Sequence, residues 1–373
     1  MRLAGYTYLI EELELALPPL GLELGIGNKS TDEILPYGFS RIKVLSKSRK
    51  VGDCIFDNIE AGINYQGIRL AYLKPIFERI SKDELTKYIA LKPQAVQRRC
   101  IWFLYEWLTG SRLDLPNSKS NYARLLNDEY YFCCKDGVKD TRTRIINNVL
   151  GNIDFCPMIR KTPEIVELQY KDLMKEAQQK LMQIHKYVNP ELLGRSVQYL
   201  YTKETKSSTE IEKESTDEDK MRKFHRVLKT AGAIPLSKRR LLDVQHEIVR
   251  SNKKDEDYRA DEIYVGETRP SWHDGVEENI HYIGPKKEHV PKLMSGLIGM
   301  HRALLLDDTL PPMMHAAILS FGFVYIHPFS DGNGRIHRYL IHDVLKSRKT
   351  IEQDFIIPVS ATILQNNTKY DVL

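Results

Sequence analysis

The sequence predicts a mainly α-helical protein with more than one domain. Residues 95–109 place apolar side chains at helical spacing, and residues 312–326 are apolar almost all round, which is typical of a helix buried at the centre of a domain. Short strand-like runs separated by Gly, Pro and Asp are clearest in residues 258–284. A chain of 373 residues also exceeds what one hydrophobic core usually supports, so two or more domains are expected.

The N-terminal half is predicted to be mixed but mainly helical. Residues 21–38 are rich in turn formers, and residues 41–50 carry five basic side chains. The basic run could contact phosphate, but a solvated loop or a strand edge is the favoured interpretation. The helix expected over residues 95–109 brings large aromatic side chains into the core, namely Trp102, Phe103, Tyr105 and Trp107.

Two helix starts follow. Thr162-Pro163-Glu164 and Asn189-Pro190-Glu191 each place a cap before a proline, which predicts helices to about residue 185 and through Tyr201. Residues 202–220 are then almost wholly polar, and composition alone favours an exposed linker or a solvated helix. Beyond residue 221 the expected order is a helix over 237–249, a small β-hairpin within 258–284, and helices over 290–306, 312–326 and 335–347.

Composition narrows the class of protein. The chain has 55 basic and 50 acidic residues and a net charge of +5, a near balance that argues against a dedicated nucleic-acid binder. Glutamates interrupt the apolar residues from Leu9 to Leu17, so no secretory signal is expected, and no run reaches the about 20 apolar residues of a membrane span. Five cysteines without CxxC spacing favour reduced thiols over a zinc site or a disulfide framework. We therefore expect a cytoplasmic protein.

The residues from His327 to Arg338, HPFSDGNGRIHR, combine groups suited to phosphate chemistry. The imidazole of His327 can take a proton near neutral pH, and the carboxylate of Asp331 can hold Mg²⁺. Gly332-Asn333-Gly334 before a helix can cradle an anion on backbone N–H groups. Arg335 and Arg338 share one face of that helix and can neutralise phosphate charge.

Each of these residues is ambiguous alone. A single histidine is more often structural than catalytic, and a GNG turn is common. Phe329 is most simply a core anchor that fixes the loop. His337 and His342 are five residues apart on a helix, which disfavours a two-histidine metal site. The combination is specific where its parts are not.

This stretch resembles the Fic (Fido) signature H-x-F-x-[D/E]-G-N-G-R-x-x-R at every fixed position. Members of that family transfer AMP from ATP to a Ser, Thr or Tyr hydroxyl of a protein and release pyrophosphate. The resemblance implies that His327 is the general base, Asp331 the Mg²⁺ ligand, and Phe329 a packing residue. It implies that the nucleotide contacts Ser330, Asp331, Gly332, Asn333, Gly334, Arg335 and Arg338. It covers about residues 220–373 and, more weakly, reaches back to about 195.

The resemblance extends to two further segments. The expected hairpin at 258–284 resembles the flap that docks a target segment by strand addition. Ser208-Thr-Glu-Ile-Glu212 resembles the autoinhibitory motif [S/T]-x-x-x-E-[G/N], whose glutamate pairs with the second signature arginine, here Arg338, and blocks the γ-phosphate position. Lys213 departs from the motif where Gly or Asn is usual. The implied division is an N-terminal domain of unassigned role (1–195), an inhibitory segment (196–220) and a Fic-type helical core with its flap (221–373).

The predicted function is that of an autoinhibited protein adenylyltransferase that uses ATP and Mg²⁺. Its expected partner is a protein that presents a hydroxyl side chain, and self-modification is a further expectation. The intact glycine turn favours AMP transfer over phosphorylation. Transfer of UMP, phosphocholine or phosphate, removal of AMP, and a regulatory binding protein with an idle core remain as alternatives. The sequence carries no prediction of oligomeric state.

Overall fold

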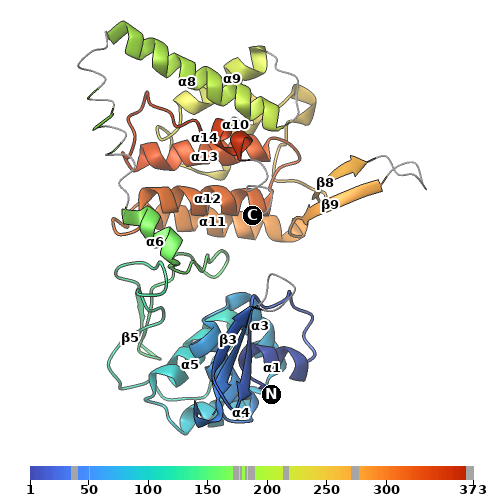
Figure 1. The fold of residues 1–373 in the computed structure, drawn as a ribbon, viewed down its shortest axis with the longest axis vertical. Coiled ribbons are helices and arrows are strands. Elements are labelled where there is room, and N and C mark those ends of the chain that lie inside the picture. Colours follow the sequence, from blue (N-terminus) through green and yellow to red (C-terminus); the bar gives the residue numbers. More distant parts are fainter. Residues whose placement is uncertain are drawn as a thin grey trace. The chain divides into compact units, whose positions relative to one another are not determined.

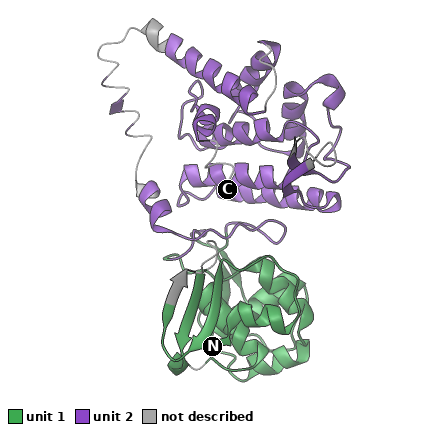
Figure 2. Cartoon of the chain, turned by 45° about the vertical axis from the view of Figure 1, so that its right-hand side comes forward, with its two compact units in different colours: residues 1–129, 136–149 green, residues 130–135, 150–373 purple. Residues whose placement is uncertain are grey.

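The computed structural model describes residues 1–34, 41–49, 51–170, 176, 179–180, 183, 190–212, 218–269 and 277–366. It consists of two compact units (Figure 2). Unit 1 comprises Met1–Glu129 and Asp136–Val149, and unit 2 comprises Tyr130–Lys135 and Leu150–Leu373. Helices predominate over small sheets, so the predicted mainly α class with a small hairpin is confirmed. The functional division predicted at residues 195 and 220 stays a prediction.

Unit 1 contains a sheet of four strands in the order β1 (Arg2–Leu3), β2 (Leu22–Gly27), β4 (Arg41–Ser46) and β3 (Thr31–Ile34). β2 and β4 are parallel, whereas the β1–β2 and β3–β4 pairs are antiparallel. The basic run at 41–50 was predicted to be a loop or a strand edge, and this is wrong for residues 41–46. β4 pairs with β2 on one edge and with β3 on the other, and its Leu45 is buried.

The helices of unit 1 lie on one side of this sheet (Figure 2). They are α1 (Gly5–Glu12), α2 (Ile55–Ala61), α3 (Leu70–Arg79), α4 (Lys82–Ala90) and α5 (Val96–Thr109), and α2 continues into a π-helical turn, η2 (Gly62–Gln66). The predicted helix over 95–109 is confirmed by α5, in which Trp102, Phe103 and Tyr105 are buried. A second sheet has the order β5 (Ala123–Arg124), β7 (Ile145–Asn147), β6 (Val138–Asp140).

Unit 2 is built around α12 (Pro312–Ile326), which lies between α11 (Val290–Leu304) and α13 (Asn333–Ser347) (Figure 1). The apolar run predicted this central position. α10 (Lys238–Ile248) begins at the predicted place because Ser237 caps it by accepting the Arg240 N–H. The predicted hairpin consists of β8 (Tyr264–Arg269) and β9 (Glu277–Ile283). This hairpin extends away from the helices of unit 2 in Figure 1.

The remaining helices of unit 2 are α6 (Pro163–Tyr170), α8 (Pro190–Ile211), α9 (Glu218–Lys229) and α14 (Val359–Gln365). α6 starts where Thr162-Pro163 predicts, but most of the expected course from residue 171 to residue 185 lies outside the described residues. α13 starts at Asn333, two residues before the predicted start. Neither asparagine nor glycine favours a helix interior, so the first turn was not recognised.

The prediction of an exposed linker or a solvated helix over 202–220 is wrong for the residues up to 212. α8 continues through this polar stretch to Ile211, and its buried face carries Glu204, Thr205, Ser208 and Thr209. Glu204 is completely buried. Its carboxylate tolerates this because it accepts hydrogen bonds from the backbone N–H (2.8 Å) and the hydroxyl (2.5 Å) of Ser360 on α14. Polar residues can form a buried helix face when such partners exist, so composition alone was misleading here.

None of the five cysteines forms a disulfide. Within the described part of the chain, no helix has the length and apolar character that a membrane span requires.

Candidate active site

His327 stands at the point where α12 ends. Its N–H still bonds to the Phe323 carbonyl oxygen at 3.0 Å, but its own backbone is left-handed, with φ 50° and ψ 60°. A non-glycine residue rarely adopts this conformation, and it turns the chain sharply out of the helix. The buried helix thus delivers the imidazole directly to the loop of residues 327–332.

The contacts of His327 set its tautomer. Its Nδ1 lies 3.1 Å from the Val324 carbonyl oxygen, which can only accept, so Nδ1 carries the hydrogen and Nε2 keeps its lone pair. Burial lowers the pKa of His327, although the hydrogen bond to Val324 opposes this shift. The neutral imidazole therefore prevails at neutral pH, with Nε2 ready to accept a proton.

The loop after His327 is held by two buried side chains. Phe329 is fully buried and contacts the rings of Tyr258 and Phe323. The amide of Asn333 closes the loop, because its Oδ1 accepts the Phe329 N–H (3.1 Å) and its Nδ2 donates to the Phe329 carbonyl oxygen (2.7 Å). The predicted packing role of Phe329 is confirmed, and Asn333 has a structural role in the turn.

Gly332 and Gly334 shape the start of α13. Gly332 has φ 89°, and a Cβ there would lie 3.0 Å from the Val249 side chain. The first backbone bond of the helix runs from the Ile336 N–H to the Gly332 carbonyl oxygen, so the amides of Asn333 and Gly334 precede the hydrogen-bonded part of the helix. This end of α13 carries the partial positive charge that attracts anions.

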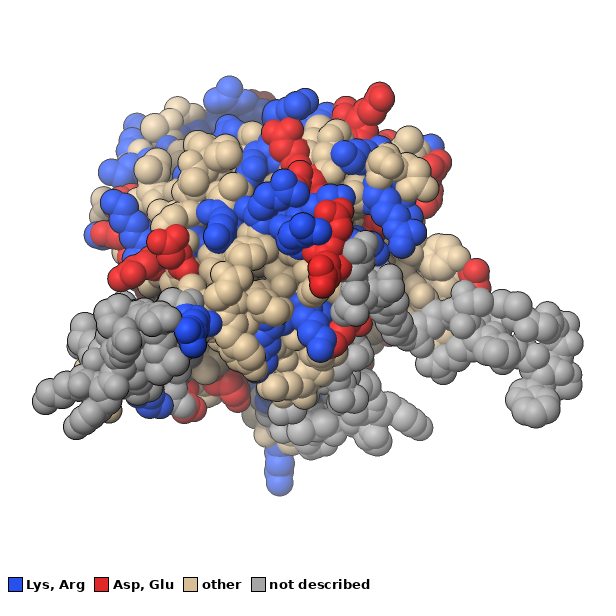
Figure 3. All heavy atoms as spheres, turned by 90° about the horizontal axis from the view of Figure 1, so that it is seen from above, with Lys and Arg blue, Asp and Glu red and all other residues tan. Residues whose placement is uncertain are grey.

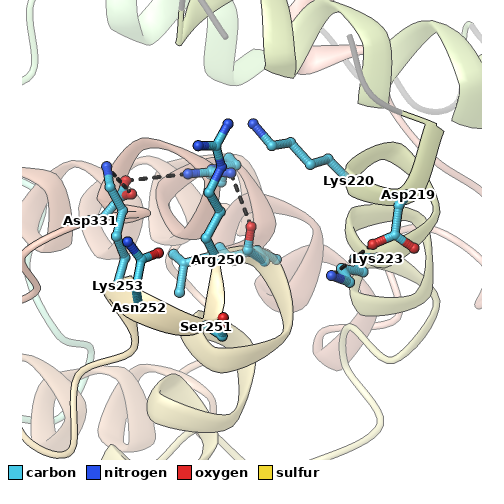
Figure 4. A pocket seen from close by; sticks show the side chains of 11 residues that line it. Asp219, Lys220, Lys223, Arg250, Ser251, Asn252, Lys253 and Asp331 are labelled. Carbon is cyan, nitrogen blue, oxygen red and sulfur yellow. Dashed lines mark hydrogen bonds and ion pairs between the residues drawn. The ribbon is translucent and has the colours of Figure 1, made fainter. Parts of the chain in front are cut away.

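Both carboxylate oxygens of Asp331 have partners (Figure 4). Oδ1 accepts the Gly332 N–H at 2.7 Å and lies 3.3 Å from an Arg335 nitrogen, while Oδ2 lies 2.9 Å from Lys253 Nζ. Burial disfavours the charged carboxylate, but the hydrogen bond from Lys253 and the charge of Arg335 outweigh it and lower the pKa of Asp331. The group is therefore ionised at neutral pH.

Asp331 fits a magnesium ion that takes one protein carboxylate and completes its shell with phosphate oxygens and water. No cluster of three or more His, Cys, Asp or Glu occurs among the described residues, so an all-protein metal cage has no support there. Lys253 is 53% exposed in its side chain and can swing away from Asp331 into solvent. Asp331 would be the one protein ligand.

Ser330 is exposed and fully engaged by Asp255. Its N–H and its hydroxyl donate to the two oxygens of that carboxylate, each at 2.9 Å. The side chain therefore fixes the loop to the segment after α10. The structure assigns Ser330 this anchoring contact, and the predicted contact with a nucleotide stays a prediction.

The two arginines of the signature are both buried and point to different partners. Arg335 donates to the Ile248 carbonyl oxygen at 3.0 Å and pairs with Asp331. Arg338 donates to the Ser208 hydroxyl through Nε (3.1 Å) and Nη2 (2.9 Å), and its Nη2 lies 2.7 Å from Glu212 Oε1. Ser208 and Glu212 thus bring the end of α8 onto α13.

The carboxylate of Glu212 also lies against the first turn of α13. A Cβ at Gly334 would collide with Glu212 Oε1, so only a glycine leaves room for this approach. The predicted pairing of Glu212 with Arg338 is present as a geometric contact, with the Glu212 side chain 27% exposed. Lys213, the departure from the motif, lies outside the described residues.

Several residues that support this site were not found from the sequence. Arg259 is buried, donates to the His327 carbonyl oxygen at 2.8 Å and fixes the base of the hairpin through the Asp261 and Pro285 carbonyl oxygens. Asp255 and Lys253 hold Ser330 and Asp331. All three lie in residues 253–259, which carry no motif, and only a three-dimensional structure places them beside the turn.

His337 and His342 contact backbone carbonyl oxygens, as structural histidines do.

Part of the chain is similar to known proteins. Residues 235–345 match the model of the Fic/DOC family, a stretch that contains the whole signature but not Ser208 or Glu212. No curated protein matches the chain. Among solved structures, a Fic family protein from Desulfovibrio desulfuricans G20 is similar at 20% identity and a TM-score of 0.43, over 57% of this chain and 66% of that chain. A Fic domain containing signaling protein from Bacteroides thetaiotaomicron VPI-5482 is similar at 19% identity and a TM-score of 0.39, over 53% and 80%. Similarities this distant carry no functional argument, so the family match alone supports a Fic/DOC domain in unit 2.

Proposed function

We propose that unit 2 is a protein adenylyltransferase that transfers AMP from ATP to a hydroxyl side chain of a protein, and that Glu212 restrains it. The observation that carries the proposal is the position of His327. A neutral imidazole with a free Nε2 stands at the mouth of a glycine turn, and the helix that follows presents its positive end and two arginines. These groups suit an incoming hydroxyl and a polyphosphate held side by side.

The chemistry follows from these groups. The target oxygen attacks the α-phosphorus of ATP, its proton passes to Nε2 of His327, and the bond from the α-phosphorus to the bridging oxygen breaks to release pyrophosphate. The amides at the start of α13 and the guanidinium groups of Arg335 and Arg338 offset the charge that develops on the phosphates. Mg²⁺ held by Asp331 would add charge neutralisation between two phosphates.

The hairpin supports a protein as the acceptor. Tyr264, Val265, Ile280 and Ile283 are exposed on β8 and β9, and the Tyr282 hydroxyl donates to the Tyr325 carbonyl oxygen near the end of α12. A strand edge fixed this close to His327 suits an extended target segment, which would pair with the hairpin by main-chain hydrogen bonds.

The restraint rests on competition for Arg338. A guanidinium that is only 3% exposed needs an anionic or polar partner, because an unpaired buried charge is costly. Glu212 supplies a carboxylate, and the γ-phosphate of ATP would supply an equivalent anion. Both cannot occupy the same nitrogen atoms. Displacement of Glu212 is therefore the step that admits a productively placed triphosphate.

The test is the intact mass of the protein after incubation with Mg²⁺ and a mixture of ATP, UTP, GTP and CTP, using the Glu212→Gly variant. The proposal expects an added AMP on the protein itself or on a supplied target. An added UMP or phosphate, or the loss of AMP from a modified target, would identify another Fic-type reaction. No adduct with any nucleotide and any target would favour a binding protein with an idle core.

A further inference from the structure

Arg259 is a buried cation that the sequence did not predict as part of the site. Lysine and arginine side chains usually lie at the surface, as many do on the face shown in Figure 3. The side chain of Arg259 is only 2% exposed, and burial lowers the pKa of its guanidinium group. Its ion pair with Glu262 is long, at 3.7 Å, and the Glu262 side chain is 61% exposed. A guanidinium group buried in this way needs nearer partners.

Backbone carbonyl oxygens supply these partners. The Nε of Arg259 donates to the His327 oxygen at 2.8 Å, Nη1 donates to the Asp261 oxygen at 2.6 Å, and Nη2 donates to the Pro285 oxygen. Its backbone N–H donates to the Pro328 oxygen at 2.8 Å. Two of these oxygen atoms flank the hairpin of β8 and β9, and the other two lie directly after α12. One residue therefore joins both ends of the hairpin to the backbone of the proposed base.

The end of α12 is completed by the hairpin and by the residues beside it. The last carbonyl groups of a helix have no partner within the helix and carry a partial negative charge. Here the Val324 oxygen faces Nδ1 of His327, and the Tyr325 oxygen accepts the hydroxyl of Tyr282 on β9. The next bonded oxygen, that of His327, accepts from Arg259. A cation is favourable at such a helix end.

The backbone of His327 needs this support. Its φ of 50° is unfavourable for a residue with a Cβ and persists only where the surroundings fix it. The peptide group between His327 and Pro328 has no N–H, so its oxygen is its one hydrogen-bonding group, and Arg259 donates to it. Because Arg259 also bonds the Pro328 oxygen, it orients two consecutive peptide groups. The direction in which the imidazole leaves the helix depends on both.

We propose that Arg259 is a positioning residue for the transfer reaction, which holds the imidazole of His327 and the base of the hairpin in one fixed arrangement. The inference rests on the proposed function for the hydroxyl that a target presents, and on the contacts of Arg259 for the arrangement itself. A target strand paired with the hairpin would bring one position of that strand to Nε2 of His327. Movement of the hairpin against His327 would lose this register, and a misplacement of about 1 Å is enough to slow such a step.

The charge of Arg259 acts on the imidazole as well. Burial is the main cause of the lowered pKa of His327, and Arg259 lowers it further, whereas the hydrogen bond to Val324 and the charge of Glu212 raise it. Arg259→Met removes the charge and every side-chain donor, so the pKa of His327 should rise toward its ordinary value of 6.5. Arg259→Lys keeps the charge but has one nitrogen atom in place of three. The two variants thus separate charge from positioning.

The first test needs no nucleotide. Hydrogen exchange of the His327 and Gly284 amides, each of which donates to a backbone oxygen, reports on the end of α12 and on the base of the hairpin. Both amides should exchange about tenfold or more faster in Arg259→Met, and by a smaller factor in Arg259→Lys. The control Arg348→Met removes a cation that donates to carbonyl oxygens at the end of α11 instead, and should leave both amides unchanged. Faster exchange at only one amide, or equal acceleration in the control, would overturn the link.

The second test measures AMP incorporation from labelled ATP in the Glu212→Gly background. Arg259→Met should lower kcat about tenfold or more, with KM for ATP unchanged because Arg259 lies outside the groups proposed to hold ATP. Its acid limb should lie at higher pH, as NMR titration of His327 checks directly. Arg259→Lys should lower kcat and keep the limb near that of its parent, and Arg348→Met should change neither. If Arg259→Met does not fold, an unchanged kcat in Arg259→Lys would overturn the proposal.

The two tests can fail separately. AMP transfer with the kcat and the acid limb of the parent in Arg259→Met would refute the positioning role alone. Joint acceleration of both amides in a protein that never transfers AMP would keep the link between the hairpin and His327, and would refute the proposed function.

Discussion

His327 and Arg338 are both buried polar side chains, and each depends on a specific partner. Burial lowers the pKa of His327 and so favours the neutral ring, while the Val324 carbonyl oxygen decides which ring nitrogen keeps its hydrogen. Burial of Arg338 has the opposite result, because a guanidinium stays charged and must find an anion. Burial thus leaves a neutral imidazole at the start of the loop, and on the helix that follows it a guanidinium that needs an anionic or polar partner.

The first prediction concerns the base. His327→Ala, in the Glu212→Gly background, should lower the rate of AMP incorporation by about 10²- to 10⁴-fold, the usual contribution of a general base. His289→Ala removes an exposed imidazole elsewhere in unit 2 and should leave the rate unchanged. Initial rates with labelled ATP measure both. Equal rates for His327→Ala and its parent would rule out the imidazole as the base.

The second prediction is the pH dependence of the same rate. The neutral imidazole is the active form, so the rate should be level above the pKa of His327 and fall as the pH drops through it. Burial places that pKa below its ordinary value of 6.5, and loss of the Glu212 carboxylate, which raises it, should lower it further. The acid limb of the Glu212→Gly protein should therefore lie below pH 6.5. A limb above this value would contradict the assigned environment.

At the scale of elements, the site depends on how two helices meet. α12 ends at His327 and α13 begins at Asn333, so the loop between them has little freedom once Phe329 and Asn333 are in place.

Phe329→Ala should lower the free energy of unfolding by about 3–5 kcal/mol, because the ring is fully buried against other aromatic rings. Phe329→Leu fills more of the space and should cost less. Chemical denaturation measures both, and equal losses would show that the ring is not packed as described.

A further prediction concerns the docking of α8. Ser360 on α14 donates both its N–H and its hydroxyl to the buried carboxylate of Glu204. Ser360→Ala leaves one carboxylate oxygen without that hydroxyl, which should cost about 1–3 kcal/mol and loosen α8. Basal AMP incorporation by the otherwise unchanged protein should rise, since Ser208 and Glu212 lie on the same segment. Thr362→Ala, on the exposed side of α14, is the matched control. Equal basal rates for the two variants would refute a role of α14 in the restraint.

The sequence predicted those elements whose pattern reflects burial directly. The bounds of α12 followed from an almost wholly apolar run, and α10 followed from the cap at Ser237. The predictions were wrong for elements whose burial depends on partners far away in the sequence. The polar face of α8 is buried only because Ser360 and Arg338 supply hydrogen bonds, and β4 is an internal strand although it is rich in basic residues.

For the whole molecule, the signature indicates where the candidate site lies, but not which other residues support it. Its motif residues lie in unit 2 and come from two segments far apart in sequence, 208–212 and 327–338. The supporting residues Lys253, Asp255 and Arg259 have no recognisable spacing, so only the fold assembles them with the turn. Unit 1 contributes none of these residues.

We infer that this site transfers AMP and that Glu212 restrains the transfer. The most direct test compares the initial rate of AMP incorporation from ATP and Mg²⁺ in the wild type, Glu212→Gly and Glu210→Gly. Glu210 lies near the end of α8, two residues before Glu212, and is exposed, so its variant makes the same substitution without touching Arg338. We predict a rate about tenfold or more above wild type for Glu212→Gly alone, as expected for loss of a charge-assisted hydrogen bond. Equal rates in all three proteins would contradict the restraint, and the absence of AMP incorporation in each would contradict the activity itself.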